Sequence, residues 1–316
     1  MIHAYTHVKW FTGKWQDPLP MPDVVTGSFL FWLGVTLAGL LLSAVFNEPL
    51  QRISFIAGIH RRLDSAQPYI AAILRIGLAL SIVFQLITNS FLSPELVADQ
   101  PWITVLLVLV LAGLVLQRTL PLSALFLSIL YGTAIAKYGL FHALDYVFYV
   151  GIIYFLVVWN TKLRPTATPA LYFFTGLSLA WVALEKMTMP ELAYDIVVGH
   201  GIPTFGFSVE DFVLISAFIE MGLAWTFIVG ILSRFISIVV TLVFIATTTV
   251  FGFKEIVGHT IVHTLLIMFL IEGEGTFKTP FQFHRSPGLR YLFVLVNFCL
   301  LLFGLMALYV AMAPQS

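Results

Sequence analysis

Charged residues are scarce in this sequence. Asp, Glu, Lys and Arg make up 10% of its 316 residues and their charges sum to zero, whereas roughly a quarter of the residues in a soluble domain are charged. Hydrophobic residues account for 59% and aromatic residues for 15%. This composition excludes a soluble globular domain and gives no sign of nucleic-acid binding. It predicts a polytopic protein whose main partner is the lipid bilayer.

Cysteine is almost absent as well. The single cysteine, Cys299, excludes an internal disulfide and a dithiol redox pair. Any electron transfer would therefore need a metal ion or a bound cofactor. Residues 1–26 also lack the basic tip and short apolar core of a secretory leader, so we expect no cleavable leader.

Long apolar runs, by contrast, recur along the whole chain. A helix needs about 20 apolar residues to cross roughly 30 Å of hydrocarbon. Ten such runs predict an all-α polytopic membrane protein with about ten transmembrane helices. They lie near 27–46, 69–88, 102–117, 121–137, 142–160, 168–185, 211–232, 234–252, 254–272 and 289–312.

Basic residues are concentrated in the loops after odd-numbered spans, which hold ten of them against five on the opposite side. Because Lys and Arg are retained on the cytoplasmic side of a membrane, both termini are predicted to be periplasmic, in a bacterial inner membrane. The ten are Arg52, Arg61, Arg62, Arg118, Lys162, Arg164, Arg234, Lys278, Arg285 and Arg290, and the five are Lys9, Lys14, Lys137, Lys186 and Lys254.

Residues 69–160 resemble residues 168–273 in the order and spacing of their motifs. Each copy has four predicted spans, an even number, so both copies have the same orientation. The repeat therefore predicts two parallel four-helix bundles with one flanking helix at each end. In both copies a proline after the first span, Pro94 or Pro190, predicts the start of a short interfacial helix.

The repeat divides the chain into four segments. Residues 1–68 hold an external N-terminal segment, the first transmembrane helix and a cytoplasmic interfacial helix; 69–160 form a degenerate four-helix repeat; 161–275 form the repeat that carries the candidate site; and 276–316 form a cytoplasmic loop and the last transmembrane helix. The interfacial helix is predicted from the mixed basic and apolar residues of PLQRISFIAGIHRRLD, which suit anionic lipid, with protein binding as the alternative.

Ionisable residues gather in the spans of the second copy. Glu255, His259 and His263 are spaced four residues apart, which on a helix drifts about 40° per step and leaves them on one face. Two of these groups could bind one metal ion, or all three could relay a proton. The predicted metal ligands are His259, His263, Glu255, Glu185, Glu220 and His200. The alternative is that these histidines are ordinary hydrogen-bonded core residues.

The first copy provides an internal comparison for this cluster. In a gapless alignment of the two copies, His142, Tyr146 and Val150 stand where Glu255, His259 and His263 do. The fold therefore does not require the histidines, and the site is predicted to belong to the second copy. His142 and Asp145 are interpreted as a hydrogen-bonded pair, with participation in the site as the alternative.

Three short motifs of the second copy are similar to those of a known family. They are LEKM with Lys186, FIEMGLAW with Glu220, and GILSR ending at Arg234. Over the second copy the chain resembles the DoxX family (DoxD-like) of small bacterial membrane proteins. The resemblance implies a four-helix membrane bundle, often connected with redox or sulfur metabolism, in which Lys186 and Glu220 form a buried ion pair and Arg234 is a cytoplasmic anchor. The duplicated bundle and the two histidines depart from that family's pattern.

The sequence leaves three functions open. The first is a membrane oxidoreductase or oxidoreductase subunit with a periplasm-facing site for a transition metal (Cu, Fe or Zn) or a quinone, served by a periplasmic redox or metal-carrying partner. In it Glu220 and Lys186 are the predicted catalytic residues. The second is a transporter of metal ions or small solutes that uses the same site. The third is a membrane scaffold or accessory subunit whose polar groups only fix helix packing.

Overall fold

The structure is a computed structural model that describes residues 16–273, 280–284 and 286–313. The chain termini, whose periplasmic location the loop count predicts, lie outside these ranges. So does the second half of the sequence EGEG at the end of the predicted ninth span, together with Lys278 and Arg285 of the loop count. All ten predicted spans fall on helices of the described chain.

Not all of these helices have the length to cross a bilayer. Among the described residues eight are long and apolar enough, or nine if one bent pair counts as a single span. The eight spans contain α2 (Gly27–Gln51), α4 (Ile70–Ile87), α6 (Leu120–Tyr138), α9 (Ala167–Thr188), α11 (Val209–Val229), α12 (Ser233–Phe251), α13 (Phe253–Glu272) and α14 (Pro287–Met312). The one predicted span left over is the third, which corresponds to α5 (Pro101–Leu114), whose 14 residues extend only about 21 Å. An all-α membrane protein is thus confirmed, but the count of ten is not.

The bent pair is the fifth predicted span. It consists of α7 (Leu140–Ala143) and the 3-10 turn η4 (Leu144–Tyr146), followed after a bend of 64° by α8 (Phe148–Val158). A break at membrane depth releases backbone carbonyls from helical hydrogen bonds, and lipid cannot pair with them. Neighbouring side chains do so here: Trp181 Nε1 donates to Phe141 O at 3.1 Å, Tyr131 OH to Ala143 O at 2.8 Å, and Ser178 Oγ to Asp145 O.

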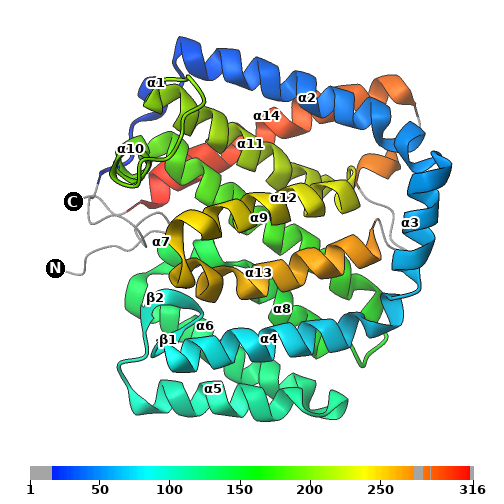
Figure 1. Cartoon of the computed structure of the whole chain (residues 1–316), viewed down its shortest axis with the longest axis vertical. Helices are drawn as coiled ribbons and strands as arrows, with labels where there is room; N and C mark the ends of the chain where they lie inside the picture. Colours follow the sequence, from blue (N-terminus) through cyan, green and yellow to red (C-terminus); the bar gives the residue numbers. More distant parts are fainter. Residues whose placement is uncertain (1–15, 274–279, 285, 314–316) are drawn as a thin grey trace.

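The two repeats pack against each other through the helices at their ends, which are α4 and α8 in the first repeat and α9 and α13 in the second. α4 packs against α13, and α8 packs against α9. α9 lies along α11, and α12 lies along α13, while α2 and α14 cover α9 and α11 (Figure 1). One buried apolar cluster spans α4, α5, α6, α8 and α13, and a second spans α2, α9, α11 and α14.

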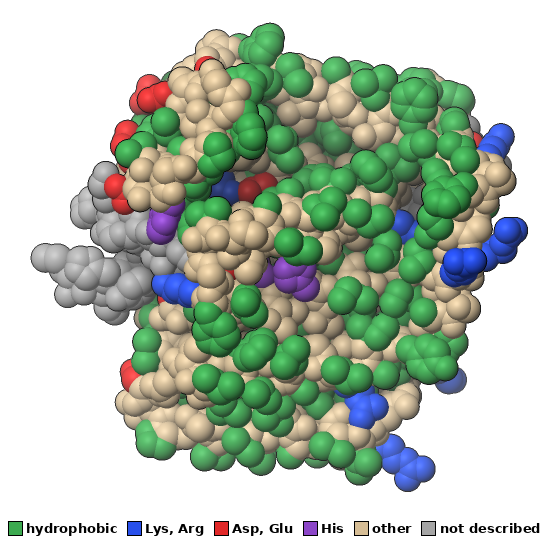
Figure 2. Space-filling view, viewed as in Figure 1, with side chains coloured by type: hydrophobic (Ala, Val, Ile, Leu, Met, Phe, Trp, Pro, Cys, Tyr) green, Lys and Arg blue, Asp and Glu red, His purple; other side chains and the backbone are tan. Residues whose placement is uncertain are grey.

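The two ends of this helical bundle differ in charge. α1 (Met21–Val24), α10 (Pro190–Gly199) and the last described turn of α14 lie at one end, which we call the outer end, and α3 (Ser54–Asp64) lies at the other, the inner end (Figure 1). Most basic side chains on the visible face gather at the inner end, and the acidic ones gather at the outer end (Figure 2). This asymmetry has the direction that the loop count predicts.

The prolines that follow the first span of each repeat have different structures. Pro190 starts α10, as predicted. The prediction for Pro94 is wrong, because it lies in the strand β2 (Ser93–Val97), which pairs with β1 (Ser90–Phe91). Side chains from neighbouring spans fix this extended shape: Gln85 Oε1 accepts from Leu92 N at 2.9 Å, and Tyr149 OH donates to Leu92 O at 2.9 Å. The backbone N–H and C=O of Leu92 are thus paired by side chains and do not need the hydrogen bonds of a helix.

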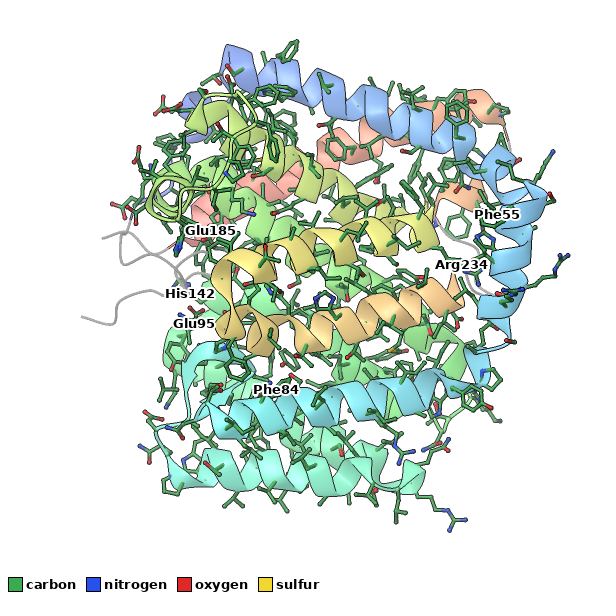
Figure 3. All side chains as sticks on the ribbon, viewed as in Figure 1. Phe55, Phe84, Glu95, His142, Glu185 and Arg234 are labelled. Carbon is green, nitrogen blue, oxygen red and sulfur yellow. The ribbon has the colours of Figure 1, made fainter. Side chains whose placement is uncertain are left out.

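At the inner end, α3 forms where the interfacial helix is predicted. Its apolar residue Phe55 is 75% exposed, while Arg61 and Arg62 lie in its last turn. Arg234, at the start of α12, connects this helix to α13: it pairs with Asp64 and donates through Nε to Leu270 O at 3.0 Å and through Nη2 to Ile271 O at 2.8 Å (Figure 3). Arg234 therefore caps the last carbonyls of α13, which agrees with the predicted anchor role.

Arg234→Lys is expected to lower the free energy of unfolding by about 1 to 3 kcal/mol, because a single ammonium group cannot reproduce the two-pronged contact and leaves one carbonyl unpaired. Equilibrium unfolding in mixed micelles measures this difference. Arg62→Lys, at an exposed position of α3, is the matched control and should change stability by less than about 0.5 kcal/mol. Equal stability of the two variants would contradict the role of Arg234 as a cap of α13.

Candidate functional site

A cavity of about 320 Å³ lies among α9, α10, α11, α12 and α13. On α9 its lining runs from Thr175 to Lys186, and on α12 from Val240 to Phe251. Both pairs are eleven residues apart, so the cavity extends about 16 Å along the helices. It reaches from the outer end of the bundle to roughly mid-depth, and its volume is in the range of small-molecule sites.

The cavity opens sideways, on a surface that a bilayer would cover. α11 and α12 meet at a short turn at the inner end and diverge toward the outer end (Figure 1). Figure 2 shows the surface hollowed between these two helices, with charged side chains at the base of the hollow. Val243 of α12 lines the cavity and is 37% exposed, and other exposed side chains of α12 are apolar too, including Leu242 at 60% and Ile245 at 52%. A lipid-soluble molecule can therefore reach the cavity from the membrane.

One polar element of the cavity wall is the ion pair between Lys186 and Glu220. Lys186 is in the last turn of α9, where the helix dipole favours a positive charge. Glu220 comes from the middle of α11. Their side chains are 20% and 26% exposed, so the pair is partly and not fully buried. This is the ion pair that the DoxX resemblance implies, and each partner lowers the energetic cost of the other's charge in an apolar wall.

A second polar element of the wall is built from α12 and α13. Oε1 of Glu255 accepts a hydrogen bond from Thr247 Oγ1 at 2.6 Å and lies 3.1 Å from Nδ1 of His259. The His259 ring stacks on Phe244, with ring centroids 4.4 Å apart. Glu255 and His259 are both buried. The arrangement fixes the orientation of the imidazole and gives the cavity a group that can accept or donate a proton.

The other predicted ligands lie outside the cavity wall. Glu185 is fully buried on the face of α9 that approaches Tyr309 of α14. His200 is exposed at the end of α10, with its ring 5.1 Å from that of Phe251. His263 meets Phe244 edge-on with centroids 5.9 Å apart.

The six predicted metal ligands are therefore divided among several places. Glu220, Glu255 and His259 line the cavity, but Glu220 is engaged by Lys186 and the other two form their own pair. Within the described ranges, no three His, Cys, Asp or Glu side chains are grouped so that they could hold one metal ion. The donor set on which a metal centre depends is not assembled in the described part of the chain, and metal binding stays a prediction.

The first repeat also contributes to the cavity. Asp145, Tyr146 and Phe148, from η4 and the start of α8, are part of its lining. The site is thus not confined to the second copy, because Asp145 lines it. The packing of α8 against α9 brings these residues in, and the sequence carries no signal of that contact beyond the presence of polar residues inside an apolar run. The predicted hydrogen bond between His142 and Asp145 stays a prediction.

Two hydroxyl residues in the wall were not predicted at all. Ser178 Oγ donates to the backbone carbonyl of Asp145. Thr175 is 1% exposed and its hydroxyl has no hydrogen-bond partner among the described residues, although it lines the cavity. A buried hydroxyl normally has a partner, so Thr175 marks a position where a polar atom of a ligand or a water molecule is expected.

Comparisons of the chain with protein-family models, with curated proteins and with solved structures find no match. The DoxX resemblance therefore stays a prediction. The function has to be inferred from the geometry of the cavity.

Proposed function

We propose that the protein is a quinone-binding membrane protein that acts as an oxidoreductase or as a subunit of one. The observation that carries this proposal is the cavity that opens sideways toward the membrane and has ionisable groups on opposite walls. A quinone has a lipid-soluble tail and a ring with two oxygens on opposite edges. Such a molecule matches a mostly apolar cavity with polar groups at separate positions.

The residues on the two walls have complementary chemistry toward such a ring. The ammonium group of Lys186 attracts a ligand oxygen that carries negative charge, and Glu220 holds that ammonium group in place. His259, oriented by Glu255, exchanges a proton with the other oxygen. Electron transfer is supplied by the quinone itself and by its redox partner, while this chain binds the ring, orients it and moves protons.

The wider features of the sequence belong to the same proposal. They are the placement in a bacterial inner membrane with the outer end toward the periplasm, the two parallel bundles, and the relation to DoxX proteins. A transporter would need polar groups that continue toward the inner end. The deepest lining residues of α11, α12 and α13 are instead apolar, namely Leu223, Val240 and Val262, and among the described residues only Thr175 of α9 brings a polar atom to that depth.

The first test is the binding of a named quinone. An alkyl hydroxynaphthoquinone, whose absorption reports its surroundings, is titrated against the full chain in lipid nanodiscs. Saturable binding is expected for the wild type, and His259→Gln should raise Kd by about tenfold, which corresponds to one lost hydrogen bond to the ligand.

His263→Gln is the matched control, because it lies one turn away on α13 but outside the cavity wall. It should leave Kd unchanged. Absence of saturable binding to the wild type would refute the proposed function. An equal loss of affinity in both histidine variants would place the ligand on the lipid-facing side of α13 and not in the cavity.

A further inference from the structure

A hydrogen-bonded pair connects the cavity with the outer end of the molecule. Tyr146 lines the cavity and is 4% exposed. Its hydroxyl donates to Oε1 of Glu95 at 2.6 Å. Glu95 belongs to β2 of the hairpin and lies at the outer end (Figure 3); the residue is partly exposed, although its carboxylate oxygen Oε2 is buried. Tyr146 therefore belongs both to the wall of the cavity and to a contact that ends near the aqueous surface.

The groups around this pair are mainly acidic or phenolic. Asp145 lines the cavity next to Tyr146 and acts electrostatically on it, on Tyr131 of α6 and on Tyr309 of α14. Further groups come from the elements packed nearby: His142 on α7, Glu185 on α9, and the Glu255–His259 pair on α13, which packs against β2. Most of these side chains are buried, so charge that enters the region is weakly screened.

The repeat gives the pair a counterpart in the second half of the chain. In the gapless alignment of the two copies, Tyr146 stands where His259 does. Each of these side chains is joined to a carboxylate: Tyr146 to Glu95 and His259 to Glu255. Both line the same cavity. The two halves therefore each bring one proton-carrying side chain with a carboxylate partner to the cavity, but only the Tyr146 pair reaches the outer end through a residue that water touches.

We propose that Tyr146 and Glu95 form a proton relay between the cavity and the outer surface. The relay rests on the proposed function, because its proton comes from the hydroxyl group of a ligand bound in the cavity. The ligand O–H bond breaks as its proton moves to the Tyr146 oxygen, while the Tyr146 O–H bond breaks as that proton moves to a Glu95 carboxylate oxygen. Glu95 then turns its carboxyl group outward and releases the proton to water, since in the structure Oε1 accepts from Tyr146 and Oε2 is buried. The ligand remains as an anion that the Lys186 ammonium group attracts, and no electron is transferred.

The same alkyl hydroxynaphthoquinone tests the relay, because it is an acid whose anion has its own colour. The probe is bound to the full chain in nanodiscs, and a stopped-flow pH jump follows protonation of the bound anion. Tyr146→Phe and Glu95→Gln keep the shape of each side chain but interrupt the relay. Each is expected to slow the colour change by roughly a hundredfold at saturating probe, a typical contribution of a positioned proton-transfer group. Glu95→Gln should leave Kd unchanged, because Glu95 does not line the cavity. Tyr146→Phe also loses its hydrogen bond to the ligand and should raise Kd by about tenfold.

Two control variants remove similar groups away from the relay. Tyr131→Phe deletes a buried hydroxyl that donates to Ala143 O, and Glu191→Gln neutralises an exposed carboxylate at the start of α10. Both should relax at the wild-type rate. If the probe binds but Tyr146→Phe and Glu95→Gln relax as fast as the wild type, the relay is refuted and the proposed function stands. If the probe does not bind the wild type, the proposed function fails first.

Discussion

Lys186→Met is expected to destabilise the protein by about 2 kcal/mol and to abolish binding of the quinone probe. The substitution keeps much of the side-chain volume but leaves the Glu220 carboxylate without its ion-pair partner in an apolar wall. Breaking a fully buried ion pair costs roughly 3 to 5 kcal/mol, and the exposure of 20% and 26% in this pair reduces that cost. Equilibrium unfolding in mixed micelles gives the loss of stability, and titration with the probe gives the loss of binding.

The double variant Lys186→Met/Glu220→Met separates packing from ligand recognition. Removing both charges leaves no uncompensated charge, so stability should return to within about 1 kcal/mol of the wild type. Probe binding should stay lost, because the ammonium group is still missing. A double variant that binds the probe normally would show that the ion pair only fixes helix packing, as a scaffold protein requires. A double variant as unstable as Lys186→Met would contradict the role of the pair as mutual charge compensation.

Gly176→Val is expected to push α9 and α11 apart and so to disrupt the wall of the cavity that these two helices form. A Cβ atom at Gly176 would lie 2.7 Å from the backbone oxygen of Ala224 and 2.6 Å from Cγ1 of Ile228. The backbone of α11 cannot move aside cheaply, and small residues at such positions let membrane helices approach closely. The free energy of unfolding should fall by about 1 to 3 kcal/mol, and separation of the helices should weaken the Lys186–Glu220 pair and probe binding.

The matched control for this prediction is Gly132→Val in α6. A Cβ atom there would have no atom within 4 Å, so the added side chain enters open space beside the helix. This variant should unfold within about 0.5 kcal/mol of the wild type and bind the probe normally. If Gly176→Val is as stable as the control, α9 and α11 are not in the close contact described.

The predictions that succeeded rest on patterns confined to one helix. The apolar runs predict where helices lie, because helix length and hydrocarbon thickness together fix the signal. The start of α11 also follows from a local pattern: in the sequence Ser-Val-Glu-Asp before an apolar run, Ser208 Oγ accepts from Asp211 N at 3.1 Å. The Glu255–His259 pair also follows from its spacing of four residues, which puts both side chains on one face of α13.

The candidate site was less predictable because a sequence does not show which face of a helix meets which neighbour. Glu185 and Lys186 are adjacent, and successive helical residues differ in direction by about 100°. Lys186 faces the cavity, so Glu185 is directed toward α14. On α13 the drift of about 40° per four residues accumulates to about 80° between Glu255 and His263. A rotation of about 40° leaves His259 in the cavity wall beside Glu255, but a rotation of about 80° takes His263 out of it.

The contribution of the first repeat could not have been found by comparing the two copies position by position. That comparison shows which residues the fold does not require, but it contains nothing about contacts between copies. The packing of α8 against α9 decides that Asp145 and Tyr146 line the cavity. The hairpin in place of an interfacial helix is likewise set by Gln85 and Tyr149, which come from other segments of the chain.

The broken fifth span has a consequence for how the protein is made. Its freed carbonyls at Phe141 and Asp145 accept hydrogen bonds from Trp181 and Ser178. Both donors belong to α9, which is synthesised after the broken span. Until α9 has entered the bilayer, those carbonyls must be paired with water or remain unpaired in lipid, and the latter costs several kcal/mol for each group. The first half of the chain therefore cannot complete its fold during biosynthesis before the second half begins to insert, so the two halves of the chain must mature together in the membrane.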